Sequence, residues 1–224
     1  MDKPSGVLMH RTHPRPQVSL HEMVRRELWS HPERIDVVHR LDRETSGLTV
    51  LGMVPAASRH LAMQFAGRGV AKRYLAIVTG AMTDGEGEID LPIGHAVGTL
   101  VRKQQAVHGD KARPAVTRWR VLGRRAGYTL VELTPDTGRL HQIRVHLAHL
   151  GHPLLGDKLY GPDPRWHLRF RAHGWTDAMA AALILPRHAL HATHLAFDHP
   201  QSGERMAFDL PLADDMAAFW NGLP

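Results

Sequence analysis

Residues 39–48, HRLDRETSGL, form the densest run of polar and charged side chains in the sequence. Mainly apolar residues lead into this run at 35–38 and leave it at 48–51. Thr45, Ser46 and Gly47 are small residues of the kind that turns require. The core holds both ends of a polar turn that lies between two apolar segments. We therefore expect Asp42 to lie in a loop that is anchored in the core.

Asp42 is flanked by Arg40 and Arg43. A guanidinium close to this carboxylate would keep it ionised and lower its pKa. An ionised and oriented carboxylate can act as a nucleophile or as a base. The spacing alone is equally compatible with a structural Asp–Arg pair that ties down the loop, so both interpretations stay open at this point.

A second polar segment, TGRLHQIRVHL, covers residues 137–147. Gly138 permits a sharp entry into a helix, and helix N-termini favour anions. Helical spacing places His141 and Arg144 three residues apart on neighbouring positions of one face. Arg144 could therefore direct its guanidinium at a carboxylate or a phosphate. The alternative is an amphipathic helix with a charged outer face.

Sequence periodicity around these segments predicts short strands, hairpins and a few helices. Helices are expected over 19–29, between Pro55 and Gly67, and over 140–150, and the first opens with the capping box Ser19 and Glu22. Expected strands cover 47–53, 74–79, a region near 86–90, 117–122, 128–134, 195–198 and 206–210. Hairpins without regular βαβ units predict an α+β fold with a largely antiparallel sheet. Since no linker interrupts the chain, we expect one continuous domain over residues 1–224.

Composition narrows the function classes. The chain has 224 residues and no Cys, which excludes a disulfide framework, a thiolate zinc site and a Cys nucleophile. Its longest apolar run, 178–185, is too short to span a bilayer, and the N-terminus has no hydrophobic signal segment, so we expect a cytoplasmic protein with no membrane partner. The formal charge is +6, and 23 of the 28 basic residues are arginine. An Arg-rich surface suggests a polyanionic partner.

Five separated motifs stand in order along the chain: DKPSG at 2–6, HRLDRETSGL at 39–48, KRYLAIVTG at 72–80, TGRLHQIRVHLAHLGHPLLGDKLYG at 137–161 and RHALHATHLAFDHP at 187–200. Together they resemble the RluA-type pseudouridine synthases. The resemblance implies the pseudouridine synthase fold, a central mixed, mainly antiparallel sheet flanked by helices and loops. The chain resembles the short members of the family, which lack an S4 domain. It departs from the family in one respect: the strand that usually precedes the Lys-Pro motif has no counterpart ahead of Lys3.

The resemblance also implies roles for individual residues. Asp42 matches the catalytic aspartate, and Arg144 matches the arginine that pairs with it. Tyr74 matches the tyrosine that stacks on the target base. Arg40 matches the arginine that fills the gap left by the flipped-out uridine. We expect the RNA-binding residues to be Arg40, Arg43, Lys3, His141, Arg102, Lys103 and Arg113.

The implied reaction is the isomerisation of uridine to pseudouridine in structured RNA, either ribosomal or transfer RNA. It needs one carboxylate beside the ribose and neither a metal nor a cofactor. The aspartate could attack C1′, attack C6 of the base or remove the 2′ proton, and the sequence leaves these three routes open. A target base inside folded RNA must be flipped out, which costs a few kcal/mol.

Three alternatives follow from other features. The His-rich stretches at 141–152 and 188–194 could bind a metal, but their spacing fits no familiar ligand pattern and no carboxylate pair completes a site. A metal-dependent nuclease is disfavoured because no carboxylate cluster surrounds Asp42 in the sequence. A non-catalytic RNA-binding protein has no need for Asp42, Tyr74 and Arg144 together. We expect a monomer without an obligate protein partner.

The positive charge is concentrated between residues 102 and 125. Eight Lys or Arg residues stand there against Asp110 alone, an excess of +7 that exceeds the excess of the whole chain. We expect this segment to form part of the wall that receives RNA phosphates. Binding should then weaken steeply with salt.

Overall fold

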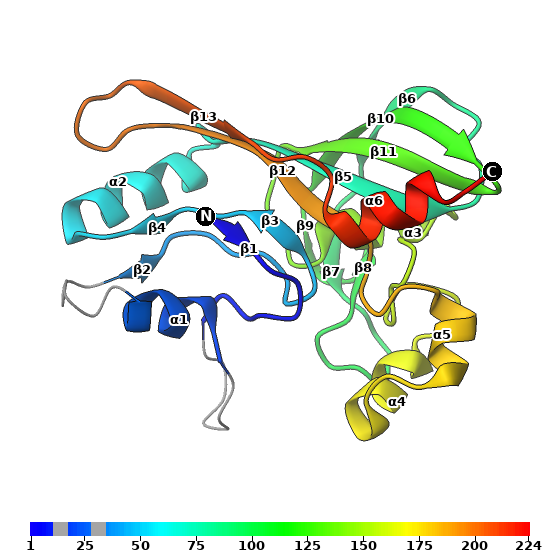
Figure 1. The fold of residues 1–224 in the computed structure, drawn as a ribbon. Coiled ribbons are helices and arrows are strands. Elements are labelled where there is room, and N and C mark those ends of the chain that lie inside the picture. Colours follow the sequence, from blue (N-terminus) through cyan, green and yellow to red (C-terminus); the bar gives the residue numbers. More distant parts are fainter. Residues whose placement is uncertain (11–17, 28–34) are drawn as a thin grey trace. The chain divides into compact units, whose positions relative to one another are not determined.

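The computed structural model describes residues 1–10, 18–27 and 35–224 (Figure 1). The chain divides into two compact units. Unit 1 contains Met1–Arg73 and His191–Pro211, and unit 2 contains Tyr74–Leu190 and Leu212–Pro224. Each unit is therefore built from two separate segments of the chain. The expectation of one continuous domain over 1–224 stays a prediction.

Strands β1, β3, β12 and β13 pair in unit 1, with the bounds Asp2–Lys3, Ser46–Leu48, Leu190–Asp198 and Arg205–Asp209. The β1–β3 and β12–β13 pairs are antiparallel, whereas β3 and β12 are parallel. Gly47 is required at the parallel pair, because a Cβ there would lie 2.2 Å from the Ala192 carbonyl oxygen and φ is +109°. Backbones at this close approach fix the strand that follows the Asp42 turn.

The helices of unit 1 are α1 (Leu20–Glu27) and α2 (Pro55–Ala66). The predicted capping box forms: the Ser19 N–H donates to a Glu22 carboxylate oxygen at 3.1 Å, and the Glu22 N–H donates to Ser19 Oγ at 3.3 Å. Residues 28–29 of the predicted first helix lie outside the described residues. The predicted strand 47–53 was wrong as one element, because the chain leaves β3 and then pairs as β4 (Leu51–Gly52) with β2 (Asp36–Val37).

Strands β5, β11, β10 and β6 pair in that order in unit 2, with the bounds Ala71–Thr79, Tyr128–Pro135, Val116–Arg125 and Glu86–Asp90. All of these pairs are antiparallel. The predicted hairpin of 117–122 with 128–134 is confirmed. Its turn is tighter than expected, because Ala126 and Gly127 both adopt positive φ and close a two-residue connection.

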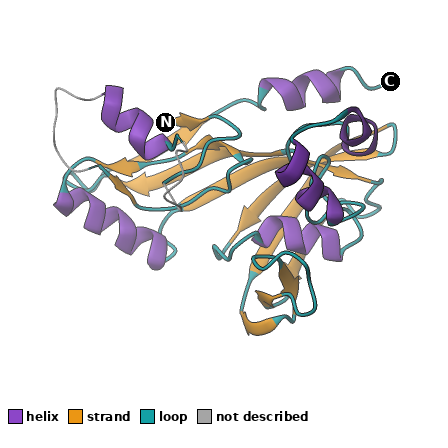
Figure 2. Cartoon of the chain, turned by 90° about the horizontal axis from the view of Figure 1, so that it is seen from below, coloured by secondary structure: helices purple, strands orange, loops and turns teal. Residues whose placement is uncertain are grey.

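Helices and a small second sheet complete unit 2 (Figure 2). The helices are α3 (Gln142–His149), α4 (Arg165–His173), α5 (Asp177–Leu183) and α6 (Asp214–Asn221). The small sheet pairs β7 (Ile93–His95) with both β8 (Gln105–Val107) and β9 (Asp110–Arg113). We call residues 93–113 the arm. Sequence periodicity did not predict the arm, α4, α5 or α6.

Apolar side chains of β5 and β11 form the main core of unit 2. Ala76, Val78, Val131 and Leu133 are fully buried, and Leu147 of α3 packs against them. Helix α3 begins two residues later than predicted, because His141 adopts a left-handed conformation with φ at +57°. The fold is α+β with mostly antiparallel pairing, as predicted.

Candidate active site

Main-chain hydrogen bonds shape the turn that carries Asp42 in unit 1. The Thr45 N–H donates to the Asp42 carbonyl oxygen at 3.2 Å, and the Gly6 N–H donates to the Arg43 carbonyl oxygen at 2.9 Å. The Ser5 hydroxyl donates to the Glu44 carbonyl oxygen at 2.9 Å. The DKPSG and HRLDRETSGL motifs thus contact each other, although about 40 residues separate them. Their contacts hold Asp42 on a turn of fixed backbone.

Lys3 is fully buried, which alters its expected role. Its ammonium donates to the carbonyl oxygens of Pro4, Val7 and Arg43 at 2.8, 2.9 and 3.2 Å. A buried ammonium that is satisfied by three carbonyl groups is a structural cross-link. The expected contact between Lys3 and RNA is therefore not supported, since this side chain has no exposed surface.

Arg40 and Arg43, the predicted RNA-binding residues of the HRLDRETSGL motif, are exposed. The Arg43 Nε donates to the Gly6 carbonyl oxygen at 3.2 Å, so Arg43 also braces the turn.

His39 fixes the other end of the turn. Its ring stacks on Phe65 of α2 with 4.3 Å between ring centres, and its Nε2 accepts the Val50 N–H at 3.0 Å. Desolvation of the ring, together with the nearby charge of Lys72, lowers the pKa of His39 to about 3. His39 is therefore neutral at physiological pH and serves as a hydrogen-bond acceptor.

Tyr74 and Arg144, the other two predicted catalytic residues, belong to unit 2. Tyr74 lies on β5 opposite Leu133 of β11 and packs against the main core. Its ring is only partly buried. Pairing of β5 with β11 thus fixes the position of Tyr74 along the sheet.

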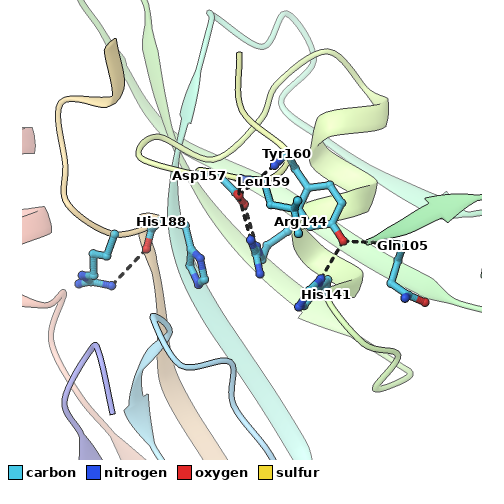
Figure 3. Close-up of polar contacts among 8 residues, drawn as sticks. Gln105, His141, Arg144, Asp157, Leu159, Tyr160 and His188 are labelled. Carbon is cyan, nitrogen blue, oxygen red and sulfur yellow. Dashed lines mark hydrogen bonds and ion pairs between the residues drawn. The ribbon is translucent and has the colours of Figure 1, made fainter. Parts of the chain in front are cut away.

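Arg144 lies on the buried side of α3 and makes a bidentate ion pair with Asp157 (Figure 3). Its Nε and Nη2 donate to the two carboxylate oxygens at 2.7 and 2.9 Å. Burial alone would raise the pKa of Asp157, but the charge and hydrogen bonds of Arg144 hold it well below its usual range. Asp157 is thus an anion at neutral pH.

Tyr160 connects this ion pair to two other parts of unit 2 (Figure 3). The Arg144 guanidinium carbon lies 4.9 Å from the centre of the Tyr160 ring. The Tyr160 hydroxyl lies 2.7 Å from His141 Nδ1 and accepts the Gln105 N–H at 2.9 Å. His141, which was expected to bind RNA, is therefore part of the network around Arg144.

The basic segment 102–125 divides into two parts. Arg102, Lys103 and Arg113 lie in the arm and are exposed, as expected of RNA-binding residues. Arg118 instead pairs with Glu88 and Asp136 at 2.8 Å, and Arg120 pairs with Glu132 at 2.9 Å. Arg118 and Arg120 are thus neutralised by acidic side chains of the protein itself, and the three arm residues expected to bind RNA are exposed.

His146 and His191, one from each His-rich stretch, make ordinary polar contacts. His146 lies 2.9 Å from Thr117 Oγ1 and 3.0 Å from the Leu91 carbonyl oxygen, and His191 Nδ1 lies 2.8 Å from Ser46 Oγ. Within residues 1–10, 18–27 and 35–224, no three His, Asp or Glu side chains gather as metal ligands would. None of the described helices has the length and apolar character needed to cross a bilayer.

Residues 1–149 match the family model of RNA pseudouridylate synthases. The chain belongs to the RNA pseudouridylate synthase family. The expected resemblance is thereby confirmed at the level of the family. The synthase match covers the turn of Asp42, the strand of Tyr74 and helix α3 with Arg144.

Several curated relatives of this chain carry the name ribosomal large subunit pseudouridine synthase D. The relative from Nitrosomonas europaea is 37% identical over 97% of this chain and 60% of its own length. Those from Haemophilus ducreyi and Pseudomonas aeruginosa are 40% and 37% identical, over 81% and 96% of this chain and over 54% and 65% of their own lengths. The chain thus spans less than two thirds of the length of these three relatives.

Solved structures of the same family share the fold. Human RNA pseudouridylate synthase domain containing 4 superposes with a TM-score of 0.73 at 27% identity, over 96% of this chain and 85% of that one. Human RNA pseudouridylate synthase domain containing 1 superposes with a TM-score of 0.74 at 25% identity, over 97% and 81%. The predicted fold class is thereby confirmed.

Sequence reasoning missed Asp157 and Tyr160. Both stand in the segment GDKLYG, residues 156–161, at the end of a motif that was already recognised. An acidic and an aromatic residue in a recognised motif were the available signal. Their contacts with Arg144 could not be read from the spacing, because a loop brings them back to α3.

Proposed function

We propose that the chain is a pseudouridine synthase that isomerises a specific uridine in structured RNA, with 1–224 acting as one catalytic domain. The observation that carries the proposal is the Asp42 turn, whose backbone is fixed by Lys3, Gly6 and Thr45 inside a family motif. A fixed turn presents one carboxylate in a defined direction, as the reaction requires.

In the proposed reaction, the N1–C1′ bond of uridine breaks and a C5–C1′ bond forms. The base rotates between these steps, C5 loses its hydrogen to solvent and N1 gains one. The RNA therefore keeps its mass and its backbone. Asp42 is the group that meets the ribose or the detached base, and Tyr74 offers an aromatic platform for the uracil.

Arg144 has the proposed role of keeping Asp42 anionic and oriented. A guanidinium next to a carboxylate lowers the pKa of that carboxylate. Arg144 lies almost entirely inside the protein, where its charge is poorly screened. These roles require no metal and no cofactor.

Exposed basic residues would bind the RNA. Arg40 is proposed to occupy the space that the flipped base leaves, because a guanidinium plane stacks well on bases. Arg43, Arg102, Lys103 and Arg113 would contact phosphates, while Lys3 keeps its structural role and His141 supports the Arg144 network.

Large-subunit ribosomal RNA is the proposed substrate, because the names of the relatives designate them as modifiers of that subunit. Transfer RNA is the second candidate. Such a substrate would place the protein in the cytoplasm. We further propose that the chain acts as a monomer without an obligate protein partner.

The proposed function can be tested with unmodified transcripts of large-subunit and transfer RNA. Each transcript is incubated with the protein and then mapped for pseudouridine. We expect pseudouridine at a defined uridine, with no change in RNA mass. RNA that is bound but unchanged would favour the non-catalytic RNA-binding alternative. Strand cleavage would favour a nuclease, and either result would contradict the proposal.

A further inference from the structure

Asp157 is more completely satisfied than an ordinary ion-pair partner. Its side chain is fully buried, and it accepts two bonds from Arg144. It also accepts the Leu159 and Tyr160 N–H groups at 2.9 and 3.0 Å. Four donors on one buried carboxylate offset the cost of removing its charge from water. The carboxylate is therefore a fixed point against which Arg144 can be aligned.

Asp157 binds one edge of the Arg144 guanidinium, and this contact determines how the remaining N–H groups of Arg144 are oriented. A guanidinium is planar and donates five hydrogens in a rigid fork. The Nε–Nη2 edge faces Asp157, so the Nη1 side is turned away from that carboxylate. The pair with Asp157 thus fixes the orientation of the whole guanidinium plane.

The Tyr160 ring restricts the remaining freedom of Arg144. It lies against the guanidinium at 4.9 Å, while Asp157 holds one edge of the fork. The Asp157 contact limits rotation of the guanidinium within its own plane, and the Tyr160 ring limits tilting of that plane. Arg144 is thereby pre-organised before any substrate binds, which lowers the cost of reaching a productive geometry.

The Tyr160 hydroxyl extends this network to the arm. It accepts the N–H of Gln105, the first residue of β8, and Gln105 is two positions beyond the exposed Lys103. The same hydroxyl bonds His141, whose left-handed backbone begins the turn into α3. The Tyr160 side chain therefore contacts both the arm, at the Gln105 N–H, and the expected catalytic arginine, Arg144 (Figure 3).

We propose that Asp157 and Tyr160 are positioning residues for Arg144, and that the Tyr160 hydroxyl couples the RNA-binding arm to it. The inference rests on the proposed function, because it assigns Arg144 a task in catalysis. Neither residue touches the substrate. Their removal should therefore reduce kcat and leave the affinity for RNA nearly unchanged.

The first variant is Asp157→Asn, with Asp215→Asn as the matched control. Asp215 makes a comparable bidentate pair with Arg187, at 2.6 and 2.7 Å, at the start of α6. We expect kcat to fall about 100-fold in Asp157→Asn, as for a misplaced catalytic group, with KM within about threefold. The control should lower Tm and leave kcat unchanged.

The second variant is Tyr160→Phe, which keeps the ring under Arg144 and removes only the hydroxyl. Tyr128→Phe is its control, because Tyr128 packs edge-on against Phe219 away from Arg144. We expect kcat to fall about tenfold, the effect of roughly 1.4 kcal/mol from one hydrogen-bonded link. The RNA Kd and its salt dependence should match those of the unmodified chain.

Repeating Asp157→Asn in an Arg144→Gln background separates positioning from general stability. If Asp157 acts only through Arg144, kcat should not fall further in that background. An equal loss in both backgrounds would overturn the inference, as would kcat within twofold of normal in both Asp157→Asn and Tyr160→Phe. These results concern only the inference when the unmodified chain makes pseudouridine, whereas an inactive unmodified chain would refute the proposed function.

Discussion

Asp42, Tyr74 and Arg144 are predicted as catalytic residues because each stands in a motif that resembles the family's. The Asp157 partner of Arg144 could not be predicted, since it lies 13 positions further along and reaches Arg144 only through a loop. The contacts of Lys3 could not be predicted from the sequence either. A lysine in a recognised motif suggests a phosphate contact, whereas its burial against three carbonyl groups depends on where residues 4, 7 and 43 come together.

His39 leads to a prediction about pH. Its folded pKa of about 3 lies below the ordinary 6.5, so the unfolded chain binds the extra proton first as the pH falls. The stability from neutral His39 is complete above pH 6.5 and is lost at up to about 1.4 kcal/mol per pH unit as the pH falls towards 3. Buried His146, whose pKa is also lowered, acts with the same sign.

Urea unfolding of the normal chain and of His39→Gln, at pH 7.5 and at pH 5, measures this effect. Glutamine retains an acceptor for the Val50 N–H but has no titrating group. We expect the normal chain to lose about 2 kcal/mol more than the variant between the two pH values. Equal losses would contradict the assigned role of His39.

Gly47 leads to a second prediction at the residue scale. Gly47→Ala places a methyl group 2.2 Å from the Ala192 carbonyl oxygen, at a φ of +109° that side chains rarely adopt. We expect a loss of about 3 kcal/mol in unfolding free energy, because backbone strain and a clash add. Gly85→Ala is the control, since no atom lies within 4 Å of the position that its Cβ would take. Equal stability of the two variants would contradict the close β3–β12 approach.

At the scale of elements, periodicity predicts best where neighbours in sequence decide the structure. The capping box of α1, the start of α2 at Pro55 and the β10–β11 hairpin are of this kind. The split of the basic segment 102–125 is different. Arg118 and Arg120 are neutralised by acids of β6 and β11, which depends on the register of three strands. The sequence of residues 102–125 alone therefore could not predict which of its basic residues are paired with acids.

The arm should therefore dominate the salt dependence of RNA binding. Replacing Arg102, Lys103 and Arg113 by Gln removes three exposed cations, and each phosphate contact contributes about 0.7 to 0.9 to the slope of log K against log salt. We expect the slope to fall by about 2 to 3. Filter binding between low and moderate salt measures it. The matched variant Arg118→Gln with Arg120→Gln should change the slope by less than 1, and an effect as large as that of the arm would contradict this division.

At the scale of the whole molecule, the fold class and the family could be predicted because five motifs keep their order over most of the chain. The division into two units could not. Unit 1 is completed only when residues 191–211 return to pair with β3, and that parallel pairing joins residues more than 140 positions apart. Asp42 stands in unit 1, and Tyr74 and Arg144 stand in unit 2. In the proposed reaction, unit 1 thus supplies the catalytic aspartate, and unit 2 supplies the tyrosine and the arginine.

The central claim, that Asp42 isomerises uridine, is tested most directly by the pseudouridine formed on an unmodified large-subunit ribosomal RNA transcript. The normal chain and Asp42→Asn are compared at equal concentration, and filter binding confirms that both retain the RNA. We predict stoichiometric pseudouridine at one uridine with the normal chain and none with Asp42→Asn, because an amide is neither nucleophile nor base in this reaction. Equal pseudouridine from both proteins would contradict the account.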